Sequence, residues 1–402
     1  MKQLSDKGLQ WRWRKFISNP LSTGSILFIS FLFLLAFFAY LIIPDKTEHA
    51  NTQHLELATK KPGFEVLFLK RKINELPQQK PFWVRLFAGK EKTYDMYSLT
   101  DYRFTADSVI IYEYTGVEQE YTLQRSFHLV DIPYSVETSY GISGKAGTYR
   151  FFDNEKESFI EVSRENLVDQ IKNEMIVERK FLLGTDRFGR DLLSRLILGA
   201  RISLSVGFIA VFISLVIGIL LGSLSGYYGG WVDNLIMWFI NVVWSIPTLL
   251  LVIALTMVLG RGFWQIFVAV GLTMWVEVAR VVRGEVKSQS KLEYIDAARV
   301  TGLNDISILF RHILPNIISP IVIIAASNFA SAILIEAGLS FLGIGVQPPI
   351  PSWGAMIRDH YGYIIVDKAY LAFIPGLSIM LLVLSFTLIG NGLRDAFDVK
   401  GR

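Results

Sequence analysis

The chain has 402 residues, a formal net charge of +4 at pH 7 and 51% apolar residues, with a mean hydropathy of +0.39. This apolar content exceeds what one soluble core needs, so the composition indicates a membrane protein. The absence of cysteine excludes disulfides, iron–sulfur clusters and thiolate zinc sites. Basic flanks facing anionic lipid explain the small positive charge, and we expect no nucleic-acid partner.

Six apolar runs are long enough for membrane-spanning helices, each of which needs about 20 residues. They lie at residues 25–43, 202–225, 235–259, 264–282, 317–338 and 369–389. All are predicted to be helices, because an open strand edge cannot satisfy its hydrogen bonds in lipid. The sequence therefore predicts an α-helical integral membrane protein with six transmembrane helices.

Lysine and arginine in the short flanks orient these spans. Residues 1–24 are strongly basic and are predicted to be a cytoplasmic segment, followed by an uncleaved first span at 25–43. Alternation places residues 44–183 outside the cytoplasm and the loop 283–316 inside it. We expect a multi-pass protein of the cell inner membrane with both termini in the cytoplasm.

Residues 44–183 break the pattern of long apolar runs. Aromatic and β-branched runs bounded by turn residues predict a mainly antiparallel sheet, and they lie at 64–69, 82–87, 108–114, 121–127 and 148–152. A helix is predicted at 164–177. Residues 143–148 lack the spacing of a phosphate-binding loop and are predicted to be a glycine turn. We therefore expect an inserted, mainly β extracytoplasmic domain between helices 1 and 2, without a catalytic or metal-ligating constellation.

The segment 184–195, GTDRFGRDLLSR, precedes the second span. Thr185 or Asp186 is expected to cap a helix at the outer membrane surface, with its leucines toward the membrane boundary. Arg187, Arg190 and Asp191 would then point to water or to a partner. An ordinary amphipathic helix and a substrate-contacting surface are both compatible with this pattern.

The loop 283–316 is predicted to hold two short helices. Ser290 and Glu293 have the spacing of a capping box, Gly302 stands where a helix would end, and Asn304 with Asp305 can start a second helix.

Spacing places Tyr294, Ala297, Ala298 and Thr301 on one face of the first helix. Two alanines would let a partner approach closely, while Asp296 and Arg299 flank the face. The alternative is a helix that packs on its own bundle, and spacing alone does not decide between the two.

Two further sites are predicted near the outer side. Glu336 lies inside the fifth apolar run, where it would line a pathway or form hydrogen bonds across the bundle. Small residues around it suit close helix packing. The turn 339–356 is expected to be a rigid hairpin at the outer membrane surface, with Trp353 as an interface anchor. Its tight path depends on Gly343, Gly345, Pro348 and Pro349.

These motifs resemble the permease subunits of ABC importers. In that family the cytoplasmic loop runs Glu-Ala-Ala, three residues, Gly, nine residues, Ile, one residue and Leu-Pro. The matching positions are Asp296, Ala297, Ala298, Gly302, Leu314 and Pro315. His312 replaces the isoleucine and, like the turn 339–356, is similar to the dipeptide and oligopeptide branch. Trp238 and Asn241 depart from the usual Arg and Asp, so an ion pair there is not expected.

The resemblance implies a type I importer permease fold, with residues 184–402 as the permease core and 283–316 as the ATPase-coupling loop. It also implies a non-catalytic subunit that forms half of a pathway for di- or oligopeptides. The implied partners are a second homologous permease, two ABC ATPases that hold ATP and Mg, and an extracytoplasmic substrate-binding protein. This chain itself would bind no cofactor.

Other functions remain open from the sequence. The imported solute could be another small molecule, such as a nickel chelate. A secondary transporter would need several intramembrane carboxylates or an inverted repeat, and neither is evident. A membrane-anchored sensor or enzyme would not need six spans.

Overall fold

The computed structural model describes residues 13–74, 80–116, 123–145, 147–260 and 262–397. Within them the chain divides into two compact units. A helical unit comprises the described parts of Met1–Phe37 and Leu198–Arg402, and a β unit comprises those of Phe38–Ile197.

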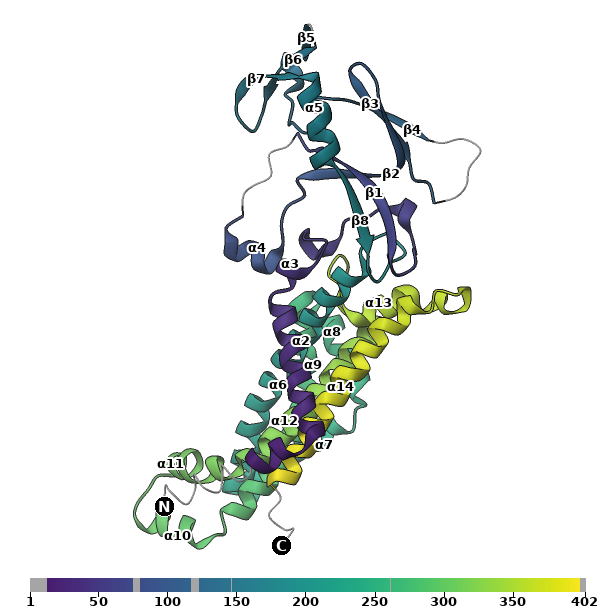
Figure 1. Cartoon of the computed structure of the whole chain (residues 1–402). Coiled ribbons are helices and arrows are strands. Elements are labelled where there is room, and N and C mark those ends of the chain that lie inside the picture. Colours follow the sequence, from purple (N-terminus) through teal and green to yellow (C-terminus); the bar gives the residue numbers. More distant parts are fainter. Residues whose placement is uncertain (1–12, 75–79, 117–122, 146, 261, 398–402) are drawn as a thin grey trace. The chain divides into compact units, whose positions relative to one another are not determined.

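The helical unit is built from long helices and a few short ones (Figure 1). They are α2 (Pro20–Phe37), α6 (Leu192–Tyr228), α7 (Gly230–Trp244), α8 (Thr248–Leu259), α9 (Phe263–Gln289), α10 (Glu293–Val300), α11 (Asp305–Ile308), α12 (Ile318–Phe341), α13 (Trp353–His360) and α14 (Tyr370–Phe397). The first residues of α6 belong to the β unit. α14 packs against α12 and α2, while α9 contacts α7, α8 and α12.

Five helical segments of the described chain are long and apolar enough to cross a membrane. The pair α7 and α8 makes a sixth only if its two halves count as one span, and they are bent by 90°. The prediction of one straight helix at 235–259 is therefore wrong. Pro247 explains the break, since it has no N–H to donate and disfavours helical geometry in the preceding residue.

Three glycines of α6 form a seam against α9. A Cβ atom would lie 2.9 Å from the Trp275 carbonyl oxygen at Gly218, 2.6 Å from that of Ala279 at Gly222 and 2.7 Å from that of Arg283 at Gly226. The four-residue spacing places all three on one face, so the two backbones approach as in other small-residue membrane helix pairs. No side chain larger than hydrogen fits there without displacing α9.

The β unit holds two antiparallel sheets, with strand orders β4-β3-β2-β1-β8 and β5-β6-β7. The strands are β1 (Phe64–Lys72), β2 (Tyr94–Phe104), β3 (Ser108–Glu113), β4 (Gln124–His128), β5 (Ser143–Lys145), β6 (Thr148–Asp153), β7 (Ser158–Ser163) and β8 (Ile176–Phe181). A core of aliphatic and aromatic side chains includes Leu69, Leu99, Ile111, Phe151 and Leu167. The prediction of a mainly antiparallel sheet is confirmed.

Individual elements of this unit differ from expectation. Residues 82–87 were expected to be a strand but form helix α4 (Phe82–Ala88), capped by Pro81. Only Leu86 of α4 is buried, so the aromatic content that suggested a strand has no sheet neighbour to pack against. The helix expected at 164–177 is α5 (Arg164–Gln170) plus a π turn, Ile171–Met175, before β8 begins. Residues 121 and 122 of the fourth predicted strand lie outside the described residues.

We predict that Gly222→Val lowers the unfolding temperature of the detergent-solubilised protein, because the added atoms force α9 away at a cost of about 1–3 kcal/mol. Gly284→Val is the matched control, since a Cβ at Gly284 meets no atom within 4 Å. Differential scanning fluorimetry measures both variants. Equal unfolding temperatures would contradict a tight α6–α9 seam.

Candidate functional site

The loop between α9 and α12 folds as α10, a glycine turn and α11. Gly302 has a φ of +81° and ends α10, while the Asn304 side chain accepts a hydrogen bond from Ser307 N and begins α11. Both predicted boundaries are confirmed. The predicted capping box is wrong, because α9 continues to Gln289 and Ser290 becomes its C-cap. Leu292, without a side-chain hydrogen bond, begins α10 instead.

One face of α10 packs on its own bundle. Ile295 and Ala298 are buried in an apolar cluster with Val282, Val286 and Ile308. The expectation that Ala298 faces a partner is therefore wrong, because the 3.6-residue repeat turns Ala298 inward with Ile295. Ala297 stays exposed. Of the two alternatives for α10, the structure shows packing on the bundle for this face.

The opposite side of the loop exposes apolar side chains. Val300 is 89% exposed, Ile306 67% and Leu303 39%. Sequence spacing did not single them out, because they lie on two helices and the turn between them. They form a surface that we call the loop face: Val300, Leu303 and Ile306.

The remaining predicted loop residues support this geometry. Arg299 forms an ion pair with Asp296 at 3.2 Å, and its guanidinium lies 5.5 Å from the centre of the Tyr227 ring. Tyr294 Oη donates to Gln289 Oε1 at 2.8 Å and accepts from Asn316. Thr301 is the C-cap of α10, and Glu293 is its first residue. Leu314 and Pro315 begin a 3-10 turn, Leu314–Ile317, before α12.

An ion pair between Asp233 and Arg283 connects α7 to α9. α7 also carries Trp238 and Asn241, the two positions that depart from the family pattern. Arg283 donates to both oxygens of Asp233, at 2.5 and 2.7 Å, and Ser225 donates to the same carboxylate. Nearby, Arg280 donates to Asn241 Oδ1 at 2.7 Å and stacks on Trp244. Asn241 thus accepts a charge-assisted hydrogen bond from an arginine, and its neutral amide forms no ion pair.

A cavity of about 230 Å³ lies beside the α7–α8 break. Its polar lining comes from Glu277, Thr248, Thr273 and Ser331, and apolar residues complete the wall. Glu277 is exposed near the middle of α9 and makes no hydrogen bond or ion pair with any residue that the structure describes. Sequence reasoning missed Glu277, although a carboxylate within the run 264–282 was a sufficient signal.

Glu336, the carboxylate that the sequence analysis selected, lies on α12. It is fully buried, and Ser340 Oγ donates to its Oε1 at 2.7 Å, while Ser352 Oγ donates to Ser340 Oγ at 3.2 Å. It does not line the cavity beside Glu277. Of its two predicted roles, the geometry corresponds to the hydrogen-bonding one, here toward the outer turn.

The outer turn is held tightly. Gly343 has a φ of +80°, a Cβ at Gly345 would lie 2.4 Å from the Ser340 backbone, and the Pro348–Pro349 bond is cis. Trp353 was expected as an interface anchor, but it is 1% exposed. Its ring packs against Gly199, where a Cβ would approach to 2.7 Å. Because Gly199 has no side chain, the indole ring of Trp353 can be buried inside the helical unit.

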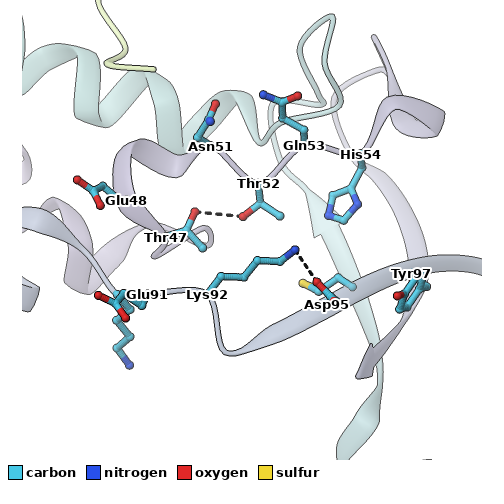
Figure 2. Close-up of a pocket in the computed structure, with 12 residues that line it drawn as sticks. Thr47, Glu48, Asn51, Thr52, Gln53, His54, Glu91, Lys92, Asp95 and Tyr97 are labelled. Carbon is cyan, nitrogen blue, oxygen red and sulfur yellow. Dashed lines mark hydrogen bonds and ion pairs between the residues drawn. The ribbon is translucent and has the colours of Figure 1, made fainter. Parts of the chain in front are cut away.

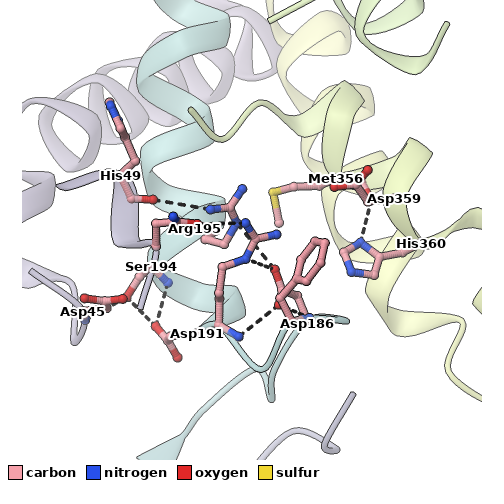
Figure 3. A network of polar contacts seen from close by, with 12 residues as sticks. Asp45, His49, Asp186, Asp191, Ser194, Arg195, Met356, Asp359 and His360 are labelled. Atoms are coloured by element: carbon pink, nitrogen blue, oxygen red, sulfur yellow. Dashed lines mark hydrogen bonds and ion pairs between the residues drawn. The ribbon is translucent and has the colours of Figure 1, made fainter. Parts of the chain in front are cut away.

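The segment 184–195 is part of a buried polar cluster in the β unit (Figure 3). Arg190 Nε lies 2.6 Å from Asp186 Oδ2, and Arg190 Nη1 donates to Asn51 at 3.0 Å. Thr185 donates to the Leu57 carbonyl oxygen. Arg190 and Asp191 are at most 4% exposed, so the expectation that they point to water is wrong, whereas Arg187 is exposed.

Asp191, rather than Thr185 or Asp186, caps α6. Its Oδ2 accepts hydrogen bonds from Ser194 N at 2.8 Å and from Ser194 Oγ. Burial raises the pKa of the Asp191 carboxyl, and the two bonds from Ser194 oppose this. Since α6 is continuous with the span, no separate surface helix exists here. Through its hydrogen bonds to Asn51 and Leu57, the segment 184–195 holds residues 51–57 against the start of α6.

A cavity of about 660 Å³ in the β unit is lined by side chains of both charge signs (Figure 2). Lys92 pairs with Asp95 at 2.7 Å. The nearby Glu56 accepts a hydrogen bond from Ser98 at 2.8 Å. Although burial opposes it, hydrogen bonding from His54, the backbone and Ser98 lowers the Glu56 pKa.

The aromatic side chains of this unit differ in their exposure. Trp83 is 70% exposed, but on α4 rather than on a strand. Tyr94 and Tyr97 pack against the main core, and Tyr114 packs against a second cluster around Phe68.

No group of three or more potential metal-ligating side chains lies together among the described residues. Two buried carboxylates of the described chain, Asp186 and Asp233, are paired with arginines.

Residues 218–400 match the family described as binding-protein-dependent transport system inner membrane component. The chain is 44% identical over 218 residues to the glutathione transport system permease protein GsiD of Pectobacterium atrosepticum, covering 54% of this chain and 72% of that protein. It is 43% identical over 217 residues to the dipeptide transport system permease protein DppC of Alkalihalophilus pseudofirmus, covering 54% and 71%.

A solved structure of the MetNI methionine ABC transporter in inward-facing conformations is 20% identical, covers 52% of this chain and 98% of its own, and has a TM-score of 0.43. That similarity is too low to support an argument.

The matches define a class, the membrane permeases of ABC importers. This chain belongs to the family of binding-protein-dependent transport system inner membrane components. It is accordingly a multi-pass inner-membrane protein, and the family works with an ATPase and a substrate-binding protein. The family match begins at residue 218, so the β unit lies before it.

We predict that Asp186→Asn destabilises the protein, because it leaves the buried Arg190 guanidinium without its counter-charge, a loss of about 3–5 kcal/mol. Asp169→Asn, which changes an exposed carboxylate of α5, is the control. Unfolding temperatures in detergent compare the two. A decrease for Asp186→Asn no larger than that for Asp169→Asn would disprove the structural role of the cluster.

Proposed function

We propose that this chain forms half of the transmembrane pathway of an ATP-driven importer of short peptides. The observation that carries the proposal is the identity of 43–44% to permeases named for dipeptide and glutathione transport. The α10–α11 loop agrees with it, since it offers an exposed apolar surface on an otherwise compact helical unit.

The remaining organisation follows from this assignment. Residues 1–24 and the C-terminus are cytoplasmic, 25–43 is the first span, and 44–183 is an extracytoplasmic domain inserted before the permease core, 184–402. A type I importer fold requires a second homologous permease. Two ATPase subunits supply ATP hydrolysis with their own Mg, so this chain binds no cofactor and catalyses no reaction.

The loop face, Val300, Leu303 and Ile306, is the surface that we assign to ATPase contact. Apolar side chains exposed in water favour burial against a partner. Movement of the ATPases would be transmitted through α10 to α9, because Ile295 and Ala298 pack on Val282 and Val286. Rigid-body rocking of the two permeases would then alternate access to the pathway.

We predict that Val300→Asp reduces co-purification of the ATPase at least tenfold, since a carboxylate cannot be buried unpaired in an apolar contact. Ile365→Asp is the control, because Ile365 is also 89% exposed but lies outside the loop. Pull-down and stimulated ATP hydrolysis measure the effect. Unchanged ATPase binding by Val300→Asp would refute this assignment of the loop face.

Glu277 is the residue that we assign to the pathway, in place of Glu336. A carboxylate in the middle of a membrane helix is costly unless it faces water, a partner or a substrate. Glu277 opens on a cavity at a broken helix, the kind of place where transporters bind solutes. The charge of Glu277 suits the ammonium group of a peptide.

We predict that Glu277→Gln lowers uptake of a dipeptide with a free amino group about tenfold or more, and affects the N-acetylated dipeptide much less. Glu285→Gln, on the same helix but outside the cavity, is the control. Uptake into proteoliposomes with the full complex measures both. An equal loss for both dipeptides would exclude ammonium recognition.

The same uptake assay separates the alternative functions. Uptake of a nickel chelate but not of peptides would redirect the substrate assignment. Uptake driven by an ion gradient without ATP would indicate a secondary transporter. At the outer side, we propose that the β unit and the turn 339–356 meet the substrate-binding protein, and cysteine crosslinks in this cysteine-free chain can test this.

A further inference from the structure

The β unit has a second, smaller cavity, about 180 Å³, where cationic and apolar side chains meet. Lys46, Arg85 and Lys90 provide the positive charge, and Leu41, Phe82 and Leu86 provide the apolar wall. No carboxylate lines it. The site adjoins the larger cavity of mixed charge in Figure 2, with which it shares Lys90.

No ion pair neutralises these three cations among the described residues. Among the described residues, the side chains of Lys46, Arg85 and Lys90 form no hydrogen bond or ion pair, whereas Lys80 pairs with Glu91 at 3.3 Å. Three like charges around one small cavity repel one another. An anion placed among them would remove this repulsion and gain charge-assisted hydrogen bonds.

The surface next to the cavity is apolar and exposed. On α4, Phe82 is 54% exposed, Trp83 70% and Phe87 49%. α3 (Ala39–Ile42) contacts α4, and its Leu41 and Ile42 are also exposed. A cluster of exposed aromatic and aliphatic side chains beside basic residues is typical of a membrane interface.

Along the chain, α3 follows directly after the candidate span α2. The candidate span α2 ends at Phe37 and α3 begins at Ala39. Four residues separate Leu41 from the end of the span, a distance of at most about 15 Å along the chain. α4 is held to α3, since Gly89 at its C-cap lets the Tyr40 ring approach where a Cβ would be 2.7 Å away.

We propose that this cavity binds the phosphate of an anionic phospholipid headgroup, with the exposed face of α4 lying in the membrane interface. Lys46, Arg85 and Lys90 surround the phosphate, and Phe82 and Trp83 contact the upper acyl region. The site anchors the β unit to the leaflet from which α2 emerges. This inference does not depend on which solute the permease carries.

The test uses the full chain in nanodiscs. Because the chain has no native cysteine, Val84→Cys gives one site for a fluorophore on α4. Brominated phosphatidylglycerol should quench it more strongly than brominated phosphatidylcholine. Arg85→Gln with Lys90→Gln should weaken the preference about fivefold for each cation removed. Lys145→Gln with Lys156→Gln, exposed cations of the same unit, should leave it unchanged.

Two outcomes would overturn the proposal. Equal quenching by the two lipids would exclude an anionic headgroup. Inorganic phosphate that abolishes the preference for phosphatidylglycerol would identify a free-anion site. If the glutamine pair does not fold, Arg85→Lys with Lys90→Arg retains both charges, and loss of the preference in that variant would also reject the site.

Discussion

A backbone amide that enters hydrocarbon must keep a hydrogen-bond partner, because leaving it unsatisfied costs several kcal/mol. The helical unit meets this constraint with long helices, and the break between α7 and α8 interrupts one candidate span. There Ser245 N still bonds to the Asn241 carbonyl oxygen and Leu251 N to that of Pro247. The irregular backbone lies beside a polar cavity, where such irregularity is tolerated, and Glu277 opens on that cavity.

Close packing of α6 against α9 determines which face of α9 remains available. Val278, Ala279 and Val282 of α9 pack directly against the glycine backbone of α6, so this face of α9 is buried within the bundle. Glu277 is left on another face. The same α9 continues to Gln289 and carries the cluster on which α10 packs, which gives a continuous mechanical connection between the loop face and the cavity.

Among the described residues of the β unit, some charges are paired within the fold and others are not. Asp186 is neutralised by Arg190, and Asp191 caps α6. By contrast, the cations around the small cavity at α4 face outward without partners among the described residues. Charge that the fold does not neutralise internally is available for an external anion, and apolar surface that the core does not cover is available for lipid.

The sequence by itself determined the local and compositional features. Apolar runs longer than about 20 residues located the spans, and Gly302 with Asn304 located the turn of the loop. Aromatic and β-branched runs located β1, β3, β4 and β6 but not β2, β5, β7 and β8. These features depend on neighbouring residues along the chain. They do not depend on which surfaces meet in the folded protein. The motifs that carry the family resemblance are local in the same way, so the sequence alone was enough to identify them.

Tertiary structure alone decided which side chains are buried. Ala298, Trp353 and Arg190 were all expected at surfaces, and each is covered by residues distant in sequence: Val282, Gly199 and Asn51. The strand expected at 82–87 became a helix for the same reason, since β structure requires a neighbouring strand and none pairs with it among the described strands. Periodicity defines the faces of an element, but long-range packing determines what each face contacts.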